Sequence, residues 1–447
     1  MSPFAAGTFD LVFSAFTFHK IPTEATKIKL LRELARVVRA EGRIVNLVSS
    51  AEIYVNEQVS FGTKDFLENR CARCGDHRPG SQYPGPLAQQ PYAALTTLKV
   101  HQDDLDPATN HGGEFGFALA VGDLDHRDSL DLVVGAPKAD KLGPPVAAEA
   151  GAADIFLNPR YGEADVTRYA HLQDNDVTEN LDNHFGWSVG IGDFADPEGE
   201  DLGDVVVGDP DFDVWDPGLG VWHRSVGITH AYYGHHDATM MPQWNYDTGF
   251  WQGLSSTAAG TRLDNARRGT ALAVGNYDGD SWDDLAVGLP GSVDSSDDPL
   301  GPEGSVFIYR GDGTSLTVPF AAWDEPVIWA HPVDRHETNL FGFTLAWANT
   351  DGQEFLDLII GAPGMHNTLQ QQREGAVYIA HAVAGQPPRD WQKTRLTDGK
   401  PEPDQRFGWA VARAHRGGTS REDVFVGSPH STALGFPDAG EIFVFKY

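Results

Sequence analysis

Short apolar runs separated by glycine, proline and acidic residues dominate the chain from about residue 92 to the C-terminus. Runs such as VVVG and LIIG carry apolar residues at consecutive positions, whereas a half-buried strand would alternate apolar and polar residues. A strand without a polar face must be covered on both sides, as happens where sheets stack face to face. The pattern therefore predicts a mainly β fold in which short strands form packed sheets.

The N-terminal part follows a different pattern, which predicts a strand, a helix and a second strand. Residues 9–16 form a continuous apolar run, as expected of a buried parallel strand. Residues 23–39 place apolar side chains at helical spacing, and residues 40–42 (Ala-Glu-Gly) are expected to end this helix. A second apolar strand is expected at residues 43–50. The composition thus indicates a small α/β segment before the β region.

The change of pattern suggests three parts. Residues 1–80 form the small α/β segment, and residues 81–91, rich in Pro, Gln and Gly without periodicity, are expected to be a linker. Residues 92–447 form the β region.

Three motifs recur in the same order five times in the β region. Each unit begins with Phe-Gly or its equivalent, continues through an acidic loop into a strand ending in Gly-x-Pro, and closes with a strand led by glycine. Glycine at the strand end is expected to permit a sharp turn. A fourth strand fits after the third, for example in residues 166–173 and 324–331. The units begin at Phe115, Phe185, Gly269, Phe341 and Phe407.

This repetition predicts a β-propeller of four-stranded blades rather than a large β-sandwich with coincidental turns. The fifth unit ends at Tyr447 without residues for a fourth strand. Residues 92–102 are a separate strand candidate, and we expect them to complete the fifth blade. A closed five-bladed ring is the favoured interpretation. The alternative is part of a larger propeller with exposed blade faces.

The repeat resembles the FG-GAP repeat of integrin α-subunit β-propellers over residues 92–447, through Phe-Gly, the acidic loop and Gly-Ala-Pro. The resemblance implies calcium in the acidic loops and a non-catalytic, adhesion-type module with a protein or glycan ligand. It also implies a location outside the cell or at its surface. Propellers of this family usually have seven blades, so the five units here would be a complete ring or part of a seven-bladed one. Such propellers also accompany secreted hydrolases, which leaves an accessory-domain role as an alternative.

Residues 1–80 resemble the C-terminal half of class I methyltransferases that use S-adenosylmethionine. The resemblance rests on Phe-Asp-Leu-Val at residues 9–12 and on the helix–strand unit at residues 30–48. Only eight residues precede Phe9, so the glycine-rich turn that holds the cofactor in that family has no counterpart here. We expect a truncated segment without methyl-transfer activity; a methyltransferase-derived function remains the alternative.

The net charge of −31 changes the picture of the partners. Nucleic-acid backbones are bound through Lys and Arg, so an acidic chain argues against nucleic acid as a ligand. The sequence contains neither an apolar run long enough to insert into a membrane nor a recognisable secretory signal. It also lacks the G-x-S-x-G and H-E-x-x-H motifs of hydrolases.

The acidic loop between the first and second strands of each unit is the candidate metal site. In residues 276–284, side-chain oxygens fall at loop positions 1, 3, 5 and 9, and position 7 can offer its carbonyl. Calcium takes six to eight oxygen ligands, which such a loop can supply; the alternative is a solvated turn. The predicted ligands are Asn276, Asp278, Asp280, Trp282 through its carbonyl, and Asp284.

The remaining loops are graded by how well they keep this pattern. The fourth unit repeats it with less charge, through Asn349, Asp351, Gln353, Phe355 by its carbonyl, and Asp357. The first unit has Asp123, Asp125 and Asp131, but Arg127 at position 5 could replace the ion by pairing with the carboxylates. We therefore expect Ca²⁺ at two sites and leave the third open. The second loop is out of register and the fifth lacks an acidic start, so neither is expected to bind.

Three further groups have candidate chemistry. Trp215, Trp222 and Trp251 lie in long connectors (residues 211–225 and 246–260), where they would contact a ligand or cover the propeller edge. Cys71 and Cys74 form a lone CxxC near His77, which we interpret as incidental thiols rather than half of a zinc site. The histidines are expected to be solvated loop residues: His184, His230, His235 and His236.

Overall fold

In a computed structural model, the chain divides into two compact units. The first unit comprises Met1–Asp104 and Pro159–Thr167, and the second comprises Leu105–Asn158 and Arg168–Tyr447. The structure describes residues 9–15, 38–47, 113–127, 130–141, 149–158, 169–174, 182–196, 199, 202–217, 220–244, 251–254, 264–292, 304–317, 327–328, 339–353, 355–365, 373–383, 386, 391–397, 402–415, 420–433 and 435–447.

The described strands of the first unit are β1 (Phe9–Ala15) and β2 (Val38–Leu47), which pair in parallel. This confirms the parallel pairing expected from the apolar runs. Residues 38–42 were expected at the end of a helix, but they belong to β2. The pairing register of the two strands shifts between Phe9 and Leu11 of β1. The rest of the expected helix, the CxxC pair, the linker and the strand candidate at residues 92–102 lie outside the described residues.

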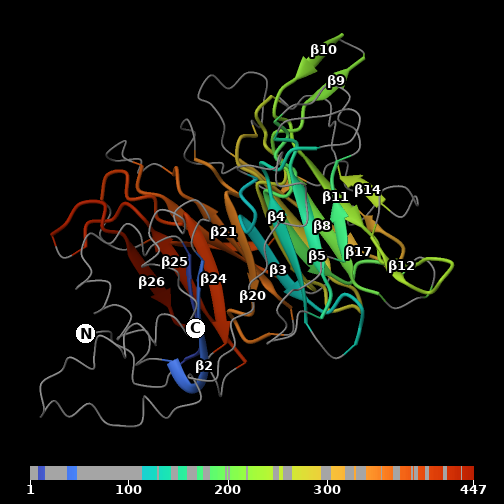
Figure 1. The fold of residues 1–447 in the computed structure, drawn as a ribbon. Coiled ribbons are helices and arrows are strands. Elements are labelled where there is room, and N and C mark those ends of the chain that lie inside the picture. The colour runs from blue at the N-terminus through green and yellow to red at the C-terminus, as the bar shows by residue number, and fades with distance from the viewer. Residues whose placement is uncertain are drawn as a thin grey trace, which may run out of the picture. The chain divides into compact units, whose positions relative to one another are not determined.

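The described part of the second unit contains one antiparallel sheet for each repeat unit, here called sheets 1 to 5 (Figure 1). Sheets 1 and 2 consist of β3 (Ala118–Gly122), β4 (Asp131–Ala136), β5 (Ala152–Phe156) and β6 (Ala170–Leu172), and of β7 (Ser188–Gly192), β8 (Asp204–Asp209), β11 (Ile228–Tyr232) and β14 (Trp251–Leu254).

Sheet 3 consists of β15 (Ala271–Gly275), β16 (Asp284–Leu289), β17 (Ser305–Gly311), β18 (Leu316–Thr317) and β19 (Val327–Ile328). Sheets 4 and 5 consist of β20 (Thr344–Ala348), β21 (Asp357–Ala362), β22 (Ala376–His381) and β23 (Gln392–Leu396), and of β24 (Ala410–His415), β25 (Glu422–Ser428) and β26 (Glu441–Phe445). Two small hairpins are β9 (Val214–Asp216) with β10 (Val221–His223), and β12 (His235–His236) with β13 (Pro242–Gln243).

The fold class is therefore the expected one, mainly β with four-stranded antiparallel sheets that resemble propeller blades. Fourth strands occur in both segments named as examples, at β6 and β19, and sheet 5 has three described strands. One expectation was wrong. Residues 246–260 were interpreted as a connector, but β14 lies within them and pairs with β11 as the outer strand of sheet 2.

The core lies between successive sheets, and the second strand is the most buried element of sheets 2 to 5, whereas in sheet 1 it is the third strand, β5. Every residue of β8, β16 and β21 is buried. The first strands are less covered than their apolar runs predict, because β3 alternates half-buried and exposed residues and β24 is largely exposed. Two-sided burial was thus correctly predicted for the second strands alone.

Successive sheets make the same backbone contact at four places. The carbonyl oxygen of Gly342, in the Phe-Gly motif of sheet 4, lies 2.0 Å from where a Cβ of Gly288 in sheet 3 would be. Only glycine leaves room for this approach, so the Gly of Gly-x-Pro serves packing between sheets rather than a sharp turn. The equivalent contacts are Gly186 on Gly135, Gly269 on Gly208, and Gly408 on Gly361.

This contact is not made between the described residues of sheets 5 and 1. A Cβ on Gly427 would first meet Ala410 of its own sheet, at 3.5 Å, and a Cβ on Gly116 would have nothing within 4 Å. Val121 of β3 is 61% exposed and Ile442 of β26 is 70% exposed. Among the described residues, the repeated contact therefore joins sheets 1 to 5 in series but does not join sheet 5 to sheet 1, so the five-bladed ring stays a prediction. Each of the four contacts is formed by one pair of glycines in neighbouring sheets, so the contacts do not by themselves fix the number of sheets.

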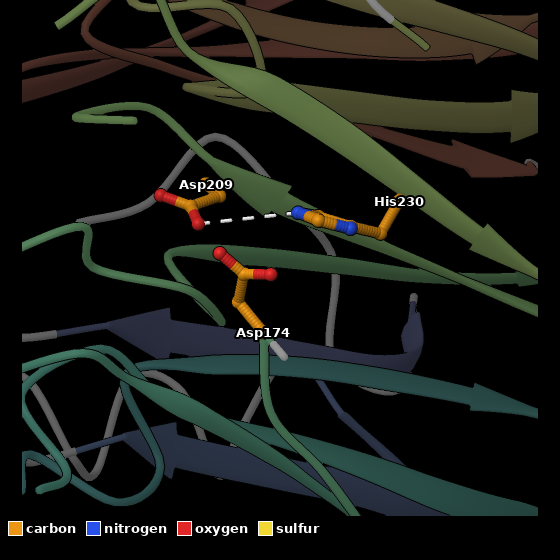
Figure 2. Close-up of side chains that lie close together, drawn as sticks. All are labelled: Asp174, Asp209 and His230. Atoms are coloured by element: carbon orange, nitrogen blue, oxygen red, sulfur yellow. Dashed lines mark ion pairs between the residues drawn. The ribbon is translucent and has the colours of Figure 1, made fainter. Parts of the chain in front are cut away.

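The interface between sheets 1 and 2 contains buried polar side chains as well as apolar ones. Phe185, Val207 and Tyr232 of sheet 2 pack in one cluster with Ile155 and Leu172 of sheet 1. Figure 2 shows Asp174, Asp209 and His230 at this interface. The expectation of solvated histidines was wrong for two of the four: His230 lies inside β11 and His235 inside β12, and both are buried. Half-buried His184 pairs through Nδ1 with Asp211, at 2.9 Å.

Candidate metal-binding loops

The aspartate that begins the second strand, at loop position 9 in units 1, 3 and 4, is a structural residue in each of the first four units. Asp284 is fully buried, and its carboxylate accepts the backbone N–H of Tyr277 at 2.8 Å and that of Gly311 at 3.2 Å. It therefore ties the loop to the end of the third strand. The equivalent pairs of donors are Leu124 and Asn158 for Asp131, Phe194 and Gly234 for Asp204, and Thr350 and Ala382 for Asp357.

Burial makes the charge on these carboxylates costly. Burial, with the nearby Asp278 and Asp280 carboxylates as a smaller cause, raises the pKa of Asp284 to about 8. Burial likewise raises the pKa of Asp131, and that of Asp204 well above the usual value. A cation at the loop would offset this cost, because opposite charge favours the ionised carboxylate.

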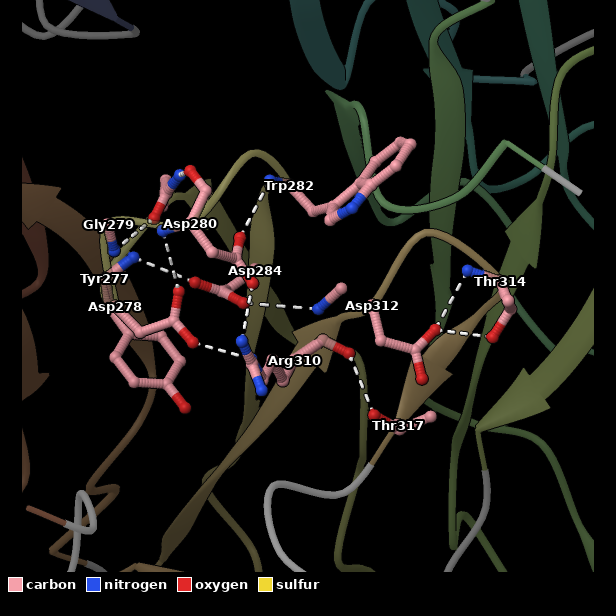
Figure 3. A network of polar contacts seen from close by, with 12 residues as sticks. Tyr277, Asp278, Gly279, Asp280, Trp282, Asp284, Arg310, Asp312, Thr314 and Thr317 are labelled. Atoms are coloured by element: carbon pink, nitrogen blue, oxygen red, sulfur yellow. Dashed lines mark hydrogen bonds and ion pairs between the residues drawn. The ribbon is translucent and has the colours of Figure 1, made fainter. Parts of the chain in front are cut away.

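The loop of sheet 3 is folded by its own side chains (Figure 3). Asn276 Oδ1 accepts the N–H of Gly279 at 2.7 Å, and its Nδ2 donates to the carbonyl of Asp280. Asp278 Oδ1 accepts the N–H of Asp280, and Asp280 Oδ1 accepts that of Trp282. These side-chain oxygens thus accept backbone N–H groups and hold the loop in a tight turn.

Arg310 contacts this loop, and the sequence reasoning missed it. It lies on β17, and its guanidinium pairs with Asp278 through Nε and with Asp280 through Nη2, each at 2.6 Å (Figure 3). Two of the predicted calcium ligands are therefore held by an internal cation. Calcium would have to displace or share this guanidinium.

The loop of sheet 4 has the same fold with a weaker cation. Asn349 Oδ1 accepts the N–H of Gly352 at 2.7 Å, and Asp351 Oδ1 accepts that of Gln353 at 2.9 Å. His381 of β22 lies 3.5 Å from Asp357, from Nδ1 to Oδ2, and donating to that carboxylate raises the pKa of His381. Ligand atoms of Asp351, Asp357 and His381 lie within 4.8 Å of one another.

The loop of sheet 1 brings all three predicted carboxylates together. Ligand atoms of Asp123, Asp125 and Asp131 lie within 4.8 Å of one another. Arg127 pairs with Asp125, with Nε 3.7 Å from Oδ2, but its side chain is 63% exposed, so the choice between arginine and ion stays open. Asn158 also donates to Asp125 Oδ2, at 2.9 Å.

Arg310 and His381 could have been found from their position near the end of the third strand, in register with the aspartate that begins the second strand. Leu285 pairs with Tyr309, and Leu358 pairs with Ala380, so Arg310 and His381 are equivalent in register. An alignment of the third strands at this position would have revealed that each loop is faced by a different side chain. The corresponding residues of sheets 1, 2 and 5 are Leu157, Tyr233 and Lys446.

An aromatic hairpin projects from sheet 2, between its second and third strands (Figure 1). β9 and β10 pair antiparallel, with Trp215 opposite Trp222. The ring centroids are 5.4 Å apart, and Trp215 is 46% exposed. The neighbouring Val221 is 44% exposed. The hairpin thus presents an apolar surface to solvent rather than covering the edge of a sheet.

Among the described residues, no helix has the length and apolar character needed to cross a membrane.

Comparison with known proteins shows two separate likenesses. Residues 1–46 match the model of a methyltransferase domain family. Integrin alpha-V of Gallus gallus is 25% identical over 145 residues, which are 31% of this chain and 12% of that protein. Integrin alpha-PS2 of Drosophila melanogaster is 25% identical over 198 residues, 43% of this chain and 12% of that protein.

An alpha-L-arabinanase of Penicillium chrysogenum, solved with arabinobiose, aligns with 78% of this chain and 81% of its own, at 12% identity and a TM-score of 0.37. The chain spans about an eighth of the length of the two integrin subunits. It is thus similar to integrin α subunits in their FG-GAP propeller region, and to a methyltransferase domain at its N-terminus.

Proposed function

We propose that the five-sheet unit is a calcium-stabilised, non-catalytic module that binds a protein ligand outside the cell. The observation that carries this proposal is the β9–β10 hairpin, whose exposed Trp215 and half-buried Trp222 stand on a rigid sheet. Tryptophan is enriched among the residues that dominate binding energy at protein interfaces. The likeness to integrin α subunits supports the same kind of role.

Calcium in this proposal occupies the loops of sheets 1, 3 and 4 and stiffens the edge of each sheet. The support is chemical: ligand atoms of the loops of sheets 1 and 4 lie within 4.8 Å of one another. The loop of sheet 3 is supported by carboxylates that already hold a guanidinium and by buried Asp284, which would gain from a nearby positive charge. Extracellular modules bind calcium with dissociation constants of about 10⁻⁴ to 10⁻³ M. Such loops would be filled outside the cell.

The test is selection of a displayed peptide library on the full-length chain in 1 mM calcium, beside a glycan array. We expect enriched peptides that lose at least about tenfold in affinity for Trp222→Ala and Trp215→Ala variants. The matched control is Val383→Ala, since Val383 is an exposed apolar residue outside the hairpin. Peptide binding that is indifferent to both tryptophans, or enrichment of glycans alone, would overturn the proposal.

Methyl transfer is the second candidate, favoured by the family match over residues 1–46. Equilibrium dialysis of the full-length chain with labelled S-adenosylmethionine tests it. We expect no saturable binding, because the matched residues 1–46 contain no glycine-rich turn of the kind that holds this cofactor. Saturable binding would favour a methyltransferase function over a non-catalytic one.

A further inference from the structure

The interface between sheets 1 and 2 contains a polar cluster with an unusual geometry. Asp209 ends β8, and His230 lies on β11, where Ile228 pairs with Asp209 and His230 pairs with Val207. Residues two apart on paired strands share a face, so both side chains lie on the face that carries Val207 toward sheet 1. Asp174 follows β6 of sheet 1, and the three side chains point toward one another (Figure 2).

The side chains of this cluster are buried, and two of them lack hydrogen bonds. Asp174 and His230 are 1% exposed and Asp209 is fully buried. Neither carboxylate oxygen of Asp209 and neither ring nitrogen of His230 has a hydrogen-bond partner within the described structure. The distance from His230 Nε2 to Asp209 Oδ2 is 3.9 Å, too long for a hydrogen bond. Buried polar groups are nearly always partnered, so an arrangement of this kind calls for a ligand.

Both unpartnered residues depart from the repeat, so the fold itself does not require them. The position of Asp209 is occupied in the other sheets by Ala136, Leu289, Ala362 and Ser428, and that of His230 by Asp154, Phe307, Tyr378 and Phe443. The position of Asp209 is small or apolar in the other sheets, and that of His230 is aromatic in sheets 3 to 5 and an aspartate in sheet 1, so sheet 2 is the one described sheet that places a carboxylate beside an imidazole here. Such a coincidence points to a shared role.

We propose that Asp174, Asp209 and His230 bind a divalent transition-metal ion of the zinc type, which joins sheet 1 to sheet 2. Two ligand atoms about 2.1 Å from one ion lie at most about 4.2 Å apart. The ligand atoms here lie within 4.8 Å of one another, close to that span. An imidazole nitrogen with two carboxylates suits zinc or manganese, whereas calcium prefers oxygen ligands alone.

Neighbouring residues position the cluster. Asn183 is fully buried, and its Nδ2 donates to Asp174 Oδ2 at 3.3 Å, which orients that carboxylate. Its Oδ1 is buried without a hydrogen bond and adds a further oxygen to this interface. Lys141 donates to the backbone carbonyl of Asp174, at 2.8 Å, rather than to its carboxylate. The site is independent of the calcium loops, because it shares no residue with them.

The test is titration of the chelator-stripped full-length chain with Zn²⁺, followed by calorimetry and by the thermal midpoint. Cys71→Ser and Cys74→Ser form the background, so that the CxxC pair cannot contribute. The variants are Asp209→Ala and His230→Phe, which install the residues of sheets 1 and 4 and of sheets 3 and 5 at these positions. Because these residues already pack in equivalent sheets, both variants should fold. The matched control is His381→Phe, which removes the histidine of the sheet 4 loop.

We expect the background protein to bind one equivalent of Zn²⁺ that both variants lose and the control keeps. The zinc-dependent rise in the thermal midpoint should be lost with it, while the midpoint in chelator stays the same or rises. Zinc stoichiometry unchanged in both variants would overturn the proposal. No zinc-dependent rise in the midpoint at 100 times the Kd of a comparable zinc site would also overturn it, since a buried water would then satisfy the cluster.

Discussion

At the residue scale, the acidic loops contain two kinds of aspartate that the sequence pattern does not separate. The spacing predicts tight loops, and the side-chain oxygens of Asn276 and Asp280 accept backbone N–H groups within their loop. It does not predict that Asp284 accepts backbone N–H groups, because its donors become neighbours only when the third strand packs beside the loop. Arg310 was missed for the same reason, since it comes from β17.

We expect Asp204→Ala to lower the free energy of unfolding by about 2–4 kcal/mol in the presence of chelator. The carboxylate of Asp204 accepts the N–H groups of Phe194, Ala195 and Gly234, and alanine would leave all three buried without a partner. Urea unfolding with EGTA measures the change. Asp280→Ala is the comparison and should lower calcium stoichiometry with a smaller loss of stability. A loss in Asp204→Ala that appears only with calcium would show that the aspartate acts through the ion.

We expect Arg310→Gln to tighten calcium binding at the loop of sheet 3 by about two- to fivefold. The substitution removes the guanidinium that competes for Asp278 and Asp280, an ion pair of partly exposed groups worth up to about 1 kcal/mol. Calcium titration by calorimetry measures the affinity. Lys138→Gln removes a separate ion pair with Glu114 and should have no effect. Weaker binding in Arg310→Gln would mean that the arginine supports the loop instead of competing.

At the element scale, strand order was predictable because each motif specifies its own strand. In the third unit Arg268 stands in place of the Phe of Phe-Gly. It still packs on the third strand of its own sheet, because its buried guanidinium lies 4.3 Å from the centroid of the Phe307 ring. The strand β14 was not predicted, because its apolar signal is short and lies among turn residues. The role of Gly288 was also beyond the sequence, because it depends on the next sheet.

We expect Gly288→Ala to destabilise the protein by about 3 kcal/mol, because its Cβ would press on a backbone carbonyl that cannot move aside alone. Gly427→Ala is the matched control, since its Cβ would meet Ala410 only at ordinary contact distance. The free energy of unfolding of each variant decides the matter. Equal losses at both glycines would mean that sheet 5 packs on a further sheet through the same contact.

At the scale of the whole molecule, the sequence predicted the repeat and its order but not how the series ends. Sheets pack in sequence from 1 to 5 through equivalent contacts, which each motif specifies locally. Closure is a property of the angles summed over all sheets, and no single motif encodes it. The exposed side chains of β3 and β26, such as Val121 and Ile442, are the residues that this summation leaves without cover in the described structure.

We expect calcium to raise the thermal midpoint of the full-length chain in a saturable way. A ligand at 100 times its dissociation constant stabilises the folded state by about 2.7 kcal/mol for each site. A melt in EGTA followed by melts at increasing calcium measures this, with magnesium as the control ion. A midpoint that does not change with calcium would make the acidic loops solvated turns.

The glycine contact between sheets has a consequence for how such a protein can vary. It joins backbone to backbone, so it does not depend on which side chains a neighbouring sheet carries. If one unit were duplicated or deleted, the sheets on either side could therefore still make this glycine contact. The number of units could then change in a single genetic event. Side chains at each interface, such as Asp209 and His230 between sheets 1 and 2, could change afterwards without altering the backbone contact.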